Sequence, residues 1–290
     1  MPAGLTARGG ACFDARARYA PFLPTRACAD HTLPVSFRLT VLGKSPSWQD
    51  RDGACTGYLL EMDGRSMLID CGSGVFGKLR SLRDYTQIDT VIVSPLHADH
   101  TLDLVPFAYA LTVGPGRGSV RPQLHAPPGA RAAWRRLCSA WGSDTLIEEA
   151  FELREYDPAG ELEIDGLRVR FQPVPHYVTT YAIALQQGAD GRRLVFSADC
   201  GPNDELVDFA RDADLLLIEA TLKEPEGDED DPPGHLTAAD AGAIGRRAGV
   251  PRLVLTHYSD ELDPDVVRAR AEAAFGGSGE LASEGASYEI

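Results

Sequence analysis

Histidine and carboxylate side chains gather in the short stretch SPLHADH, residues 94–100. Imidazole and carboxylate groups are the ligands of zinc and of similar borderline metal ions. The stretch follows the apolar run 88–93 and precedes the helix-like segment 101–111. A turn between a strand and a helix can aim His97, Asp99 and His100 into one cavity. The stretch therefore indicates a metal site.

The other histidines strengthen this interpretation. Four of the seven in the chain follow strand-like runs that end at 93, 175 or 256, namely His97, His100, His176 and His257. Side chains that follow different strands can converge at one edge of a sheet. Asp199, at the end of the run LVFSAD, adds a carboxylate after another strand. A lone histidine is more often a hydrogen-bonded structural residue, but this joint placement favours a functional site.

Alternating strands and helices must position these residues from Pro34 onward. Hairpins early and αβ units late in each half predict two sheets packed together with helices outside, in one domain. Asp63-Gly64 is typical of a tight hairpin turn. The expected strands are 35–42, 57–62, 66–70, 88–93, 151–156, 161–164, 167–175, 180–186, 192–198, 213–218, 251–256 and 279–282. The expected helices are 75–82, 101–112, 128–141, 203–212, 237–249 and 263–275.

Composition narrows the class of protein. A chain of 290 residues that is 43% hydrophobic can bury a large core. A formal net charge of −15 opposes binding to long nucleic acids, whose affinity comes mostly from Lys and Arg on phosphates. The six cysteines form no CxxC pair, so reduced thiols and a cytoplasmic location are predicted. We also expect neither a membrane span nor a secretory signal.

Residues 1–33 are predicted to form an N-terminal extension to a domain that covers 34–290. The extension contains arginines but no continuous apolar run. A disordered leader, a misassigned start codon and an arm that packs on a partner are all open interpretations.

The ordered motifs resemble one known family. The series runs from H-x-D-H through His176, Asp199, Glu219 and His235 to His257, and it lies among the segments TVLGKSPS, GYLLE, LIDCGSG, PHYVTTYAIAL, FSADCGP, LLIEATL, HLTAADAG and VLTHYS. This series is similar to the metallo-β-lactamase superfamily, specifically to its ribonuclease Z-like branch of metal-dependent hydrolases, from about Val35 to Ile290. The resemblance implies a four-layer αββα fold with a two-metal centre, at which an acidified water attacks phosphorus or a carbonyl.

The resemblance also implies a ligand set. It assigns His97 and His176 to a first metal site, Asp99, His100 and His257 to a second, and Asp199 to both. Zinc is the expected ion, with manganese open. The family places a further histidine in the first site, where this chain has a proline, whose ring offers no lone pair.

The proline at position 95 predicts a weakened first site. Three readings follow from it: an enzyme with one tight metal, an enzyme with two unequal metals, or a decayed site in a binding protein. The intact remaining motifs favour an enzyme. Cys200, next to Asp199, could supply a soft extra ligand, but adjacent strand residues point oppositely, so a small buried side chain is preferred.

Three residues are predicted to carry catalysis: Asp99, Glu219 and His235. The resemblance implies that Glu219 and His235 act as a pair that protonates the leaving oxygen. The alternative for His235 is a residue at a helix start beside Thr237, a plausible N-cap. Asp70 is expected to support the metal-bearing loops rather than bind metal. His31 and His125 match no motif and are expected to be ordinary surface or packing residues.

A small phosphodiester, with cyclic nucleotides included, is the predicted substrate. Ribonuclease Z carries a long arm for transfer RNA, whereas only the residues from Tyr177 to Ala198 separate the corresponding motifs here. The acidic segment 223–233 is expected to rim the pocket and repel polyanions, or to be a solvated loop. A lactone, thioester or other carbonyl ester is the runner-up. Binding without turnover and a homo-oligomer also remain open.

Overall fold

The computed structural model describes residues 37–189, 191–227 and 233–290. The N-terminal extension expected at residues 1–33 lies outside the described residues. The same is true of positions 228–232 in the acidic segment. None of the helices in the described ranges is long and apolar enough to cross a membrane.

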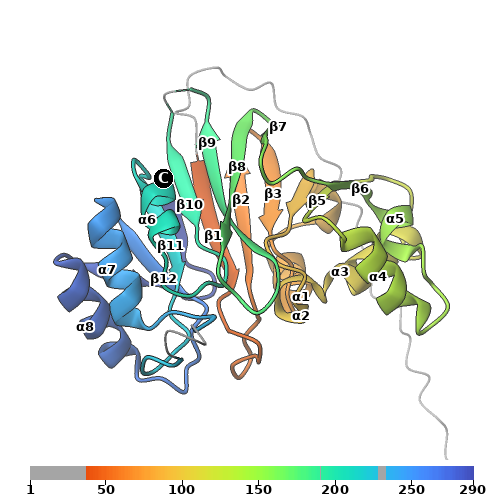
Figure 1. Ribbon diagram of the computed structural model, residues 1–290. Coiled ribbons are helices and arrows are strands. Elements are labelled where there is room, and N and C mark those ends of the chain that lie inside the picture. The colour runs from red at the N-terminus through yellow and green to blue at the C-terminus, as the bar shows by residue number, and fades with distance from the viewer. Residues whose placement is uncertain (1–36, 190, 228–232) are drawn as a thin grey trace, which may run out of the picture. The chain divides into compact units, whose positions relative to one another are not determined.

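Two seven-stranded mixed sheets lie at the centre of the fold (Figure 1). The first has the strand order β14-β1-β2-β3-β4-β5-β6, with β1 Phe37–Gly43, β2 Gly57–Met62, β3 Arg65–Ile69, β4 Thr90–Ile92, β5 Gln123–Ala126, β6 Glu152–Glu155 and β14 Ser287–Glu289. The second has the order β13-β12-β11-β10-β9-β8-β7, with β7 Glu161–Ile164, β8 Leu167–Val174, β9 Thr180–Gln187, β10 Arg193–Phe196, β11 Leu215–Glu219, β12 Leu253–Thr256 and β13 Gly279–Leu281.

Helices cover the outer face of each sheet. α1 Val75–Leu82, α3 Leu104–Thr112, α4 Ala130–Ser139 and α5 Leu146–Ala150 lie on one side of Figure 1, with the single turn α2 Ala98–Thr101 at the lower end. The 3₁₀ turn Tyr85–Gln87 precedes β4. α6 Asp204–Ala210, α7 Ala238–Ala248 and α8 Pro264–Phe275 lie on the other. The predicted four-layer αββα fold is confirmed.

Three apolar clusters hold the layers together. Side chains alternate along a strand, so each sheet presents apolar residues to both of its neighbours. One cluster, which includes Leu39, Ile69 and Leu217, lies between the sheets. A second joins the first sheet to its helices, and a third joins the second sheet to α6, α7 and α8. Strand β11 is buried along its whole length, as expected of a parallel strand covered on both faces.

Local details correct several expected boundaries. The turn at Asp63 and Gly64 is confirmed, with φ of 47° and 79°. The helix expected over 101–112 is instead divided into α2 and α3, because the Asp103 backbone N–H donates to the Cys71 carbonyl at 3.1 Å and not to the preceding helical turn. Strands β5 and β14 and helix α5 were not expected. They have three to five residues each, too few for a periodic pattern to be recognised.

Candidate metal centre

The six residues expected to bind metal meet at the lower end of the sheets in Figure 1, near α2. Potential ligand atoms of Asp99, His100, Asp199 and His257 all lie within 4.8 Å of one another. The same holds for His97, His176 and Asp199. We call the first group the buried cluster and His97 with His176 the outer pair. Asp199 belongs to both groups, as the resemblance implies.

Strained backbone positions lead into this centre. Asp70, Ala198 and His257 have φ of 58°, 52° and 52°, which non-glycine residues seldom adopt. Each residue directly follows, or lies within two residues of, the end of β3, β10 or β12. Such strain persists where the surrounding structure enforces it, and it concentrates at functional sites. Here it redirects the chain at the point where a ligand, or the residue behind a ligand, must face the centre.

The buried cluster is nearly closed to solvent. Its four residues are between 0% and 5% exposed. His100 Nε2 lies 3.0 Å from Asp199 Oδ2, and His257 Nε2 lies 3.2 Å from Asp99 Oδ2. Two carboxylates and two imidazoles therefore converge from a helical turn, a strand end and a loop that are distant in the sequence.

The outer pair lies nearer the surface. His97 and His176 are half-buried as whole residues, although the imidazole of His176 itself has no exposed surface, and His176 Nε2 lies 3.2 Å from His97 Nδ1. Burial lowers the pKa of both imidazoles, which favours neutral rings able to act as ligands. Pro95 lies two positions before His97 in the sequence. It is buried, and its side chain has no atom that could bind a metal ion.

Hydrogen bonds on the outer nitrogens orient the rings. His100 Nδ1 donates to Asp70 Oδ2 at 2.8 Å, and Asp70 in turn accepts from the Ser94 hydroxyl at 2.7 Å. His257 Nδ1 contacts Thr221 Oγ1 at 2.7 Å, and His176 Nδ1 donates to the Gly234 carbonyl at 2.7 Å. Such partners fix the tautomer and leave Nε2 as the inward-facing ligand atom. Asp70 lies behind a ligand candidate and outside both groups, as predicted.

The charge arrangement fits a bound cation. With the Nδ1 proton of His100 donated to Asp70, a neutral ring turns the Nε2 lone pair toward the carboxylate of Asp199. Two lone pairs 3.0 Å apart repel each other unless a proton or a metal ion lies between them. Asp199 Oδ1 is also buried without a hydrogen-bond partner among the described residues, although His257 Nε2 lies 3.3 Å away. This donor set fits a divalent metal ion.

The same electrostatics appear in the pKa values. Burial alone would raise the pKa of Asp199, but the imidazoles of His100 and His257 hold it well below its usual value. Burial alone would lower the pKa of His100, but the carboxylates of Asp199 and Asp70 raise it well above its usual value. The centre therefore stabilises ionised carboxylates next to a positively charged group.

Glu219 and His235 lie beside the two groups. His235 Nδ1 donates to Glu219 Oε1 at 2.8 Å, and the His235 ring stands 4.9 Å from that of His176 and 5.6 Å from that of His257, measured between centroids. Glu219 is fully buried and also accepts from the Cys200 and Leu236 backbone N–H groups. Burial alone would lower the pKa of His235, but the hydrogen bond to Glu219 and the charges of Glu219, Asp199 and Asp99 together raise it.

The alternative considered for this segment is also present. Thr237 is the N-cap of α7 and forms a capping box with Asp240. The cap and the Glu219–His235 pair thus coexist, since the histidine precedes the helix and points away from it to the glutamate. The acid–histidine pair was predicted from the motif, and its geometry suits proton transfer.

Residues outside the centre behave as the sequence analysis expected. Cys200 packs in the apolar cluster between the second sheet and its helices, and burial raises the pKa of its thiol well above the usual value. His125 lies in β5, is 4% exposed and takes no part in either group. Burial lowers its pKa to about 4. His31 lies outside the described residues.

The sequence analysis missed residues that support the centre from a distance. Lys44 Nζ donates to Asp50 and, at 3.1 Å, to the carbonyl of Tyr258, the residue after His257. The Tyr258 backbone N–H donates back to the Lys44 carbonyl at 3.2 Å. Lys44 lies in TVLGKSPS, but nothing local in that motif shows that it reaches Tyr258. Thr221 contacts His257 directly, and it was missed because the two residues are 36 positions apart in the sequence.

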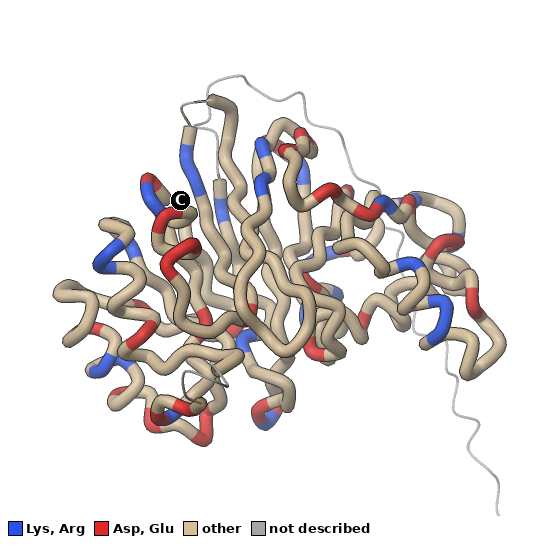
Figure 2. The backbone as a smooth tube through the Cα atoms, in the orientation of Figure 1, with Lys and Arg blue, Asp and Glu red and all other residues tan. Residues whose placement is uncertain are grey.

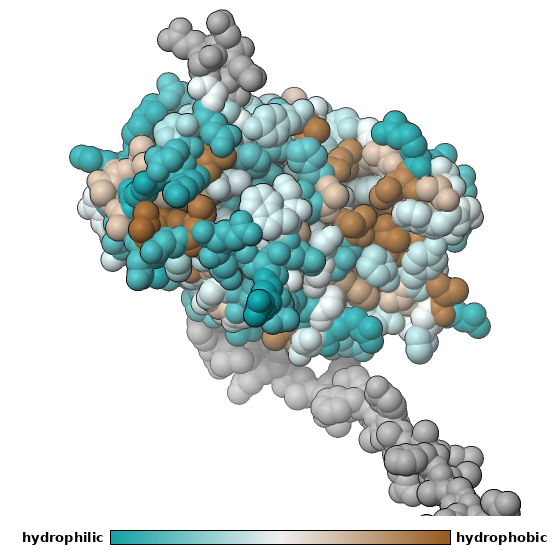
Figure 3. All heavy atoms as spheres, turned by 90° about the horizontal axis from the view of Figure 1, so that it is seen from below, coloured by the Kyte–Doolittle hydropathy of each residue, from teal (hydrophilic) through white to brown (hydrophobic). Residues whose placement is uncertain are grey.

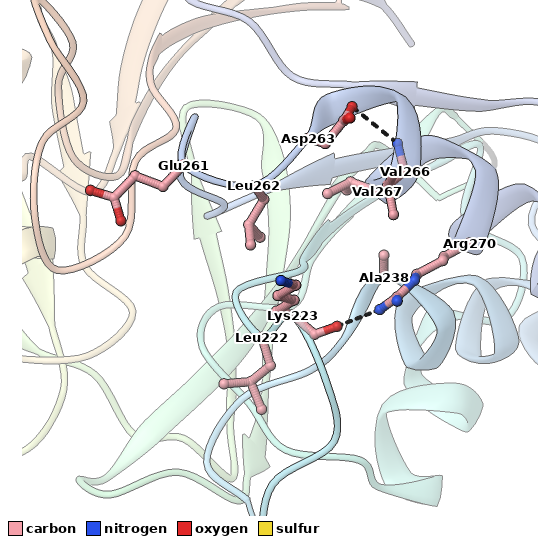
Figure 4. Close-up of a pocket in the computed structure, with 9 residues that line it drawn as sticks. All are labelled: Leu222, Lys223, Ala238, Glu261, Leu262, Asp263, Val266, Val267 and Arg270. Carbon is pink, nitrogen blue, oxygen red and sulfur yellow. Dashed lines mark hydrogen bonds between the residues drawn. The ribbon is translucent and has the colours of Figure 1, made fainter.

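A separate cavity lies between the start of α7 and α8 (Figure 4). It has a volume of about 280 Å³, and its walls include Leu222, Val266 and Val267. Arg270 spans one side by donating to the Lys223 carbonyl. None of the predicted site residues lines it.

Comparison with known proteins places these features in a family. The profile of the "Beta-lactamase superfamily domain" matches residues 65–258. The probable metallo-hydrolase YhfI of Bacillus subtilis is 30% identical over 263 residues, which cover 87% of this chain and 99% of YhfI. The ribonuclease Z of Halorubrum lacusprofundi is 26% identical over 309 aligned positions, covering 88% of this chain and 98% of that enzyme.

Solved structures agree with the sequence comparison. The crystal structure of YhfI, described as a metallo-beta-lactamase fold protein, superimposes with a TM-score of 0.78 at 26% identity and covers 89% of this chain and 100% of its own. A diphosphatase from the PhnP family superimposes with a TM-score of 0.66 at 19% identity, covering 87% and 97% of the two chains, and it shares the fold.

Proposed function

The chain belongs to the beta-lactamase superfamily and is related to its metallo-hydrolases, and we propose that it hydrolyses a small phosphodiester. The observation that carries this proposal is the Glu219–His235 pair beside the outer pair, with His235 Nδ1 at 2.8 Å from Glu219 Oε1. Hydrolysis that expels an alkoxide needs a proton for the leaving oxygen, and an oriented imidazole can supply it. A phosphodiester has a poor leaving oxygen that benefits from such a proton donor.

His235 is proposed to protonate the leaving oxygen. Glu219 holds Nδ1, so the other ring nitrogen, Nε2, is the proton-donating atom. The hydrogen bond to Glu219 fixes the ring so that Nε2 faces the centre. Glu219 is itself held by the backbone N–H groups of Cys200 and Leu236, which fix the carboxylate that orients the ring.

Asp99, His100, Asp199 and His257 are proposed to hold zinc. A bound divalent ion supplies an acidified water and polarises the attacked group. Asp99 lies beside His257, and its proposed catalytic role is to hold the metal ion that acidifies the water. His97 and His176, with a share of Asp199, are proposed to hold a second ion more weakly. Manganese is the alternative metal for either place.

Three observations support a small phosphodiester as the substrate. The ribonuclease Z of Halorubrum lacusprofundi, named for a phosphodiester-cleaving activity, aligns over 88% of this chain. Strand β9 follows His176 closely, which leaves no room for an arm that grips a long RNA. Lys and Arg number 28 against 43 Asp and Glu, and Figure 2 shows acidic residues on the lower loops. A polyanion would be repelled there.

Metal analysis and a substrate panel test the proposal together. Purified protein would be assayed for metal by elemental analysis and for hydrolysis of bis-p-nitrophenyl phosphate and a lactone panel, with zinc and manganese added separately. We expect phosphodiester hydrolysis that Asp99→Ala abolishes and Asp157→Ala, at an exposed carboxylate, leaves intact. Preferential lactone hydrolysis would replace the substrate class, and metal binding without hydrolysis of any panel member would indicate a binding protein.

A further inference from the structure

Tyr177 is an exposed aromatic residue at the edge of the candidate metal centre. It directly follows His176 and is 67% exposed, the largest exposed fraction among the large hydrophobic and aromatic residues of the described ranges. Its ring centroid lies 5.1 Å from that of His176 and 5.7 Å from that of His235. The residue therefore contacts both an outer-pair histidine and the proposed proton donor while most of its surface faces solvent.

The absence of a side chain at Gly234 makes room for the Tyr177 ring. A Cβ atom added at Gly234 would lie 2.7–2.9 Å from three atoms of the Tyr177 ring, closer than real Cβ atoms approach. Glycine thus allows the ring to rest against the backbone just before His235. The same Gly234 carbonyl accepts the hydrogen bond from His176 Nδ1 at 2.7 Å. The ring is positioned by the site rather than by the apolar core.

The surroundings of the ring suit a planar ligand group. An aromatic side chain that contributes little to the core leaves its apolar surface in water, so binding a flat partner recovers the hydrophobic and stacking free energy. Figure 3 shows the face at the lower end of Figure 1, where hydrophobic areas on two sides are separated by mostly hydrophilic surface. The planar groups that biological phosphodiesters carry are nucleobases.

We propose that Tyr177 stacks on the nucleobase of a nucleotide-sized phosphodiester substrate. The inference rests on the proposed phosphodiesterase function and adds a substrate class to it. One ribose separates a base from its phosphate. A base on Tyr177 therefore leaves the phosphate within reach of the neighbouring His235 and of the outer pair. Tyr177 is a specificity residue in this proposal, and it takes no part in proton transfer.

Binding of two ligands that differ only in the base tests this directly. Adenosine 5′-monophosphate and ribose 5-phosphate would be titrated calorimetrically into the zinc-loaded protein, Tyr177→Ala, Tyr177→Phe and the control Tyr109→Ala. Tyr109 is another exposed tyrosine, 37% exposed, on the unrelated helix α3. We expect Tyr177→Ala to weaken adenosine 5′-monophosphate by about 5- to 150-fold, the range of base–aromatic stacking, and to leave ribose 5-phosphate unchanged.

Rescue and kinetics distinguish stacking from a structural role. Tyr177→Phe keeps the aromatic face and should restore binding of the nucleotide, and Tyr109→Ala should match the parent. For thymidine 5′-p-nitrophenyl phosphate, Tyr177→Ala should raise KM with little change in kcat. For methyl p-nitrophenyl phosphate, which has no base, neither value should change.

Each contrary result has a distinct meaning. Equal weakening of both ligands by Tyr177→Ala would overturn the stacking role, and so would a parent protein that binds both ligands equally. If the base preference holds and depends on Tyr177 while no phosphodiester is cleaved, the proposed hydrolytic function fails and recognition of a base by Tyr177 stands.

Discussion

The buried cluster and the outer pair share Asp199 but are built differently. The buried cluster has four ligand candidates that are at most 5% exposed. The Nδ1 atoms of its two rings are held by side chains, those of Asp70 and Thr221. The outer pair has only two histidines, and the ring of His176 is held by a backbone carbonyl.

This difference suggests a division of work within one centre. A metal ion held by more ligands and by oriented rings binds more tightly. The outer pair has fewer ligands, but it lies next to the groups proposed to act on substrate, since the His176 ring is 4.9 Å from that of His235 and 5.1 Å from that of Tyr177. We infer that the buried cluster retains the metal while the outer side of the centre meets the substrate.

Removing a ligand from each side should have the largest effect. His257→Ala should lower zinc affinity by more than about 100-fold, beyond the loss caused by removing an outer hydrogen-bond partner, and it should abolish turnover. His97→Ala should leave one tightly bound ion in place. Zinc content after gel filtration, with the turnover of each variant, measures both effects.

A matched control separates ligand loss from damage to the core. His125→Gln changes a buried histidine in β5 that lies outside both groups, and it should retain the metal. Equal zinc affinity in His257→Ala and the parent would contradict the assignment of the buried cluster. Equal metal loss in the His257 and His97 variants would remove the distinction between the two sides.

The proton donor should affect rate without affecting metal. On a phosphodiester with an alkoxide leaving group, His235→Ala should lower turnover by about 10² to 10⁴, the range for a general acid–base group, because the leaving oxygen loses its proton source. Metal content should stay near that of the parent. Thermal unfolding checks that the buried Glu219 tolerates the loss of its partner. Parallel loss of metal and activity would make His235 a ligand and move it into the outer side of the centre.

The carboxylate behind His100 should have a moderate effect. Asp70→Asn preserves the side-chain shape, and asparagine tolerates the left-handed backbone that Asp70 adopts, with φ of 58°. The loss of charge weakens the bond to His100 Nδ1, so zinc affinity should fall by about 10- to 100-fold. Competition with a chelator measures the change. Unchanged affinity would show that ring orientation in the buried cluster does not depend on Asp70.

Much of this arrangement was predictable from short motifs. The ligand candidates follow strand ends, and the order of motifs indicated both the fold and the residues that meet, including Asp199 between the two groups. The supporting contacts were not predictable, because they join segments far apart in the sequence. Lys44 reaches the Tyr258 carbonyl across 214 positions. The positive φ angles of Ala198 and His257 were also not predictable, because neither residue is a glycine, the usual signal of such a backbone.

Tyr177 illustrates the same limit at the edge of the site. Its motif, PHYVTTYAIAL, showed a histidine before a strand, but its 67% exposure depends on where the chain around Gly234 lies. Short elements such as β5 were missed for another reason. Four residues between two prolines are too few for a repeating pattern of apolar and polar residues to be recognised. Sequence patterns thus predicted which residues lie at the site. They did not predict which neighbouring side chains hold those residues in place.

Pro95→His should produce the smallest change and the sharpest test of the comparison. The substitution adds an imidazole beside the outer pair, where the family resemblance places one, so a weak second zinc-binding event should tighten. We expect about 10-fold, the low end of the effect of a metal-site partner, because the buried turn around Pro95 must adapt to a larger polar ring. Calorimetric titration of metal-free parent and variant with zinc measures this. Pro95→Ala is the control, since it removes the proline ring without adding a donor.

The stoichiometry matters more than the activity of this variant. One strong event in the parent and in Pro95→Ala, with two in Pro95→His, would show that the outer side is weak because it lacks a ligand. Two equally strong events in the parent would show that the asymmetry is only apparent. Cys200 cannot supply the missing ligand in that case, because its thiol packs against the helices of the second sheet. The outer pair and Asp199 would then suffice by themselves, and the contacts of His176 with His235 and Tyr177, rather than weaker binding, would distinguish the substrate side of the centre.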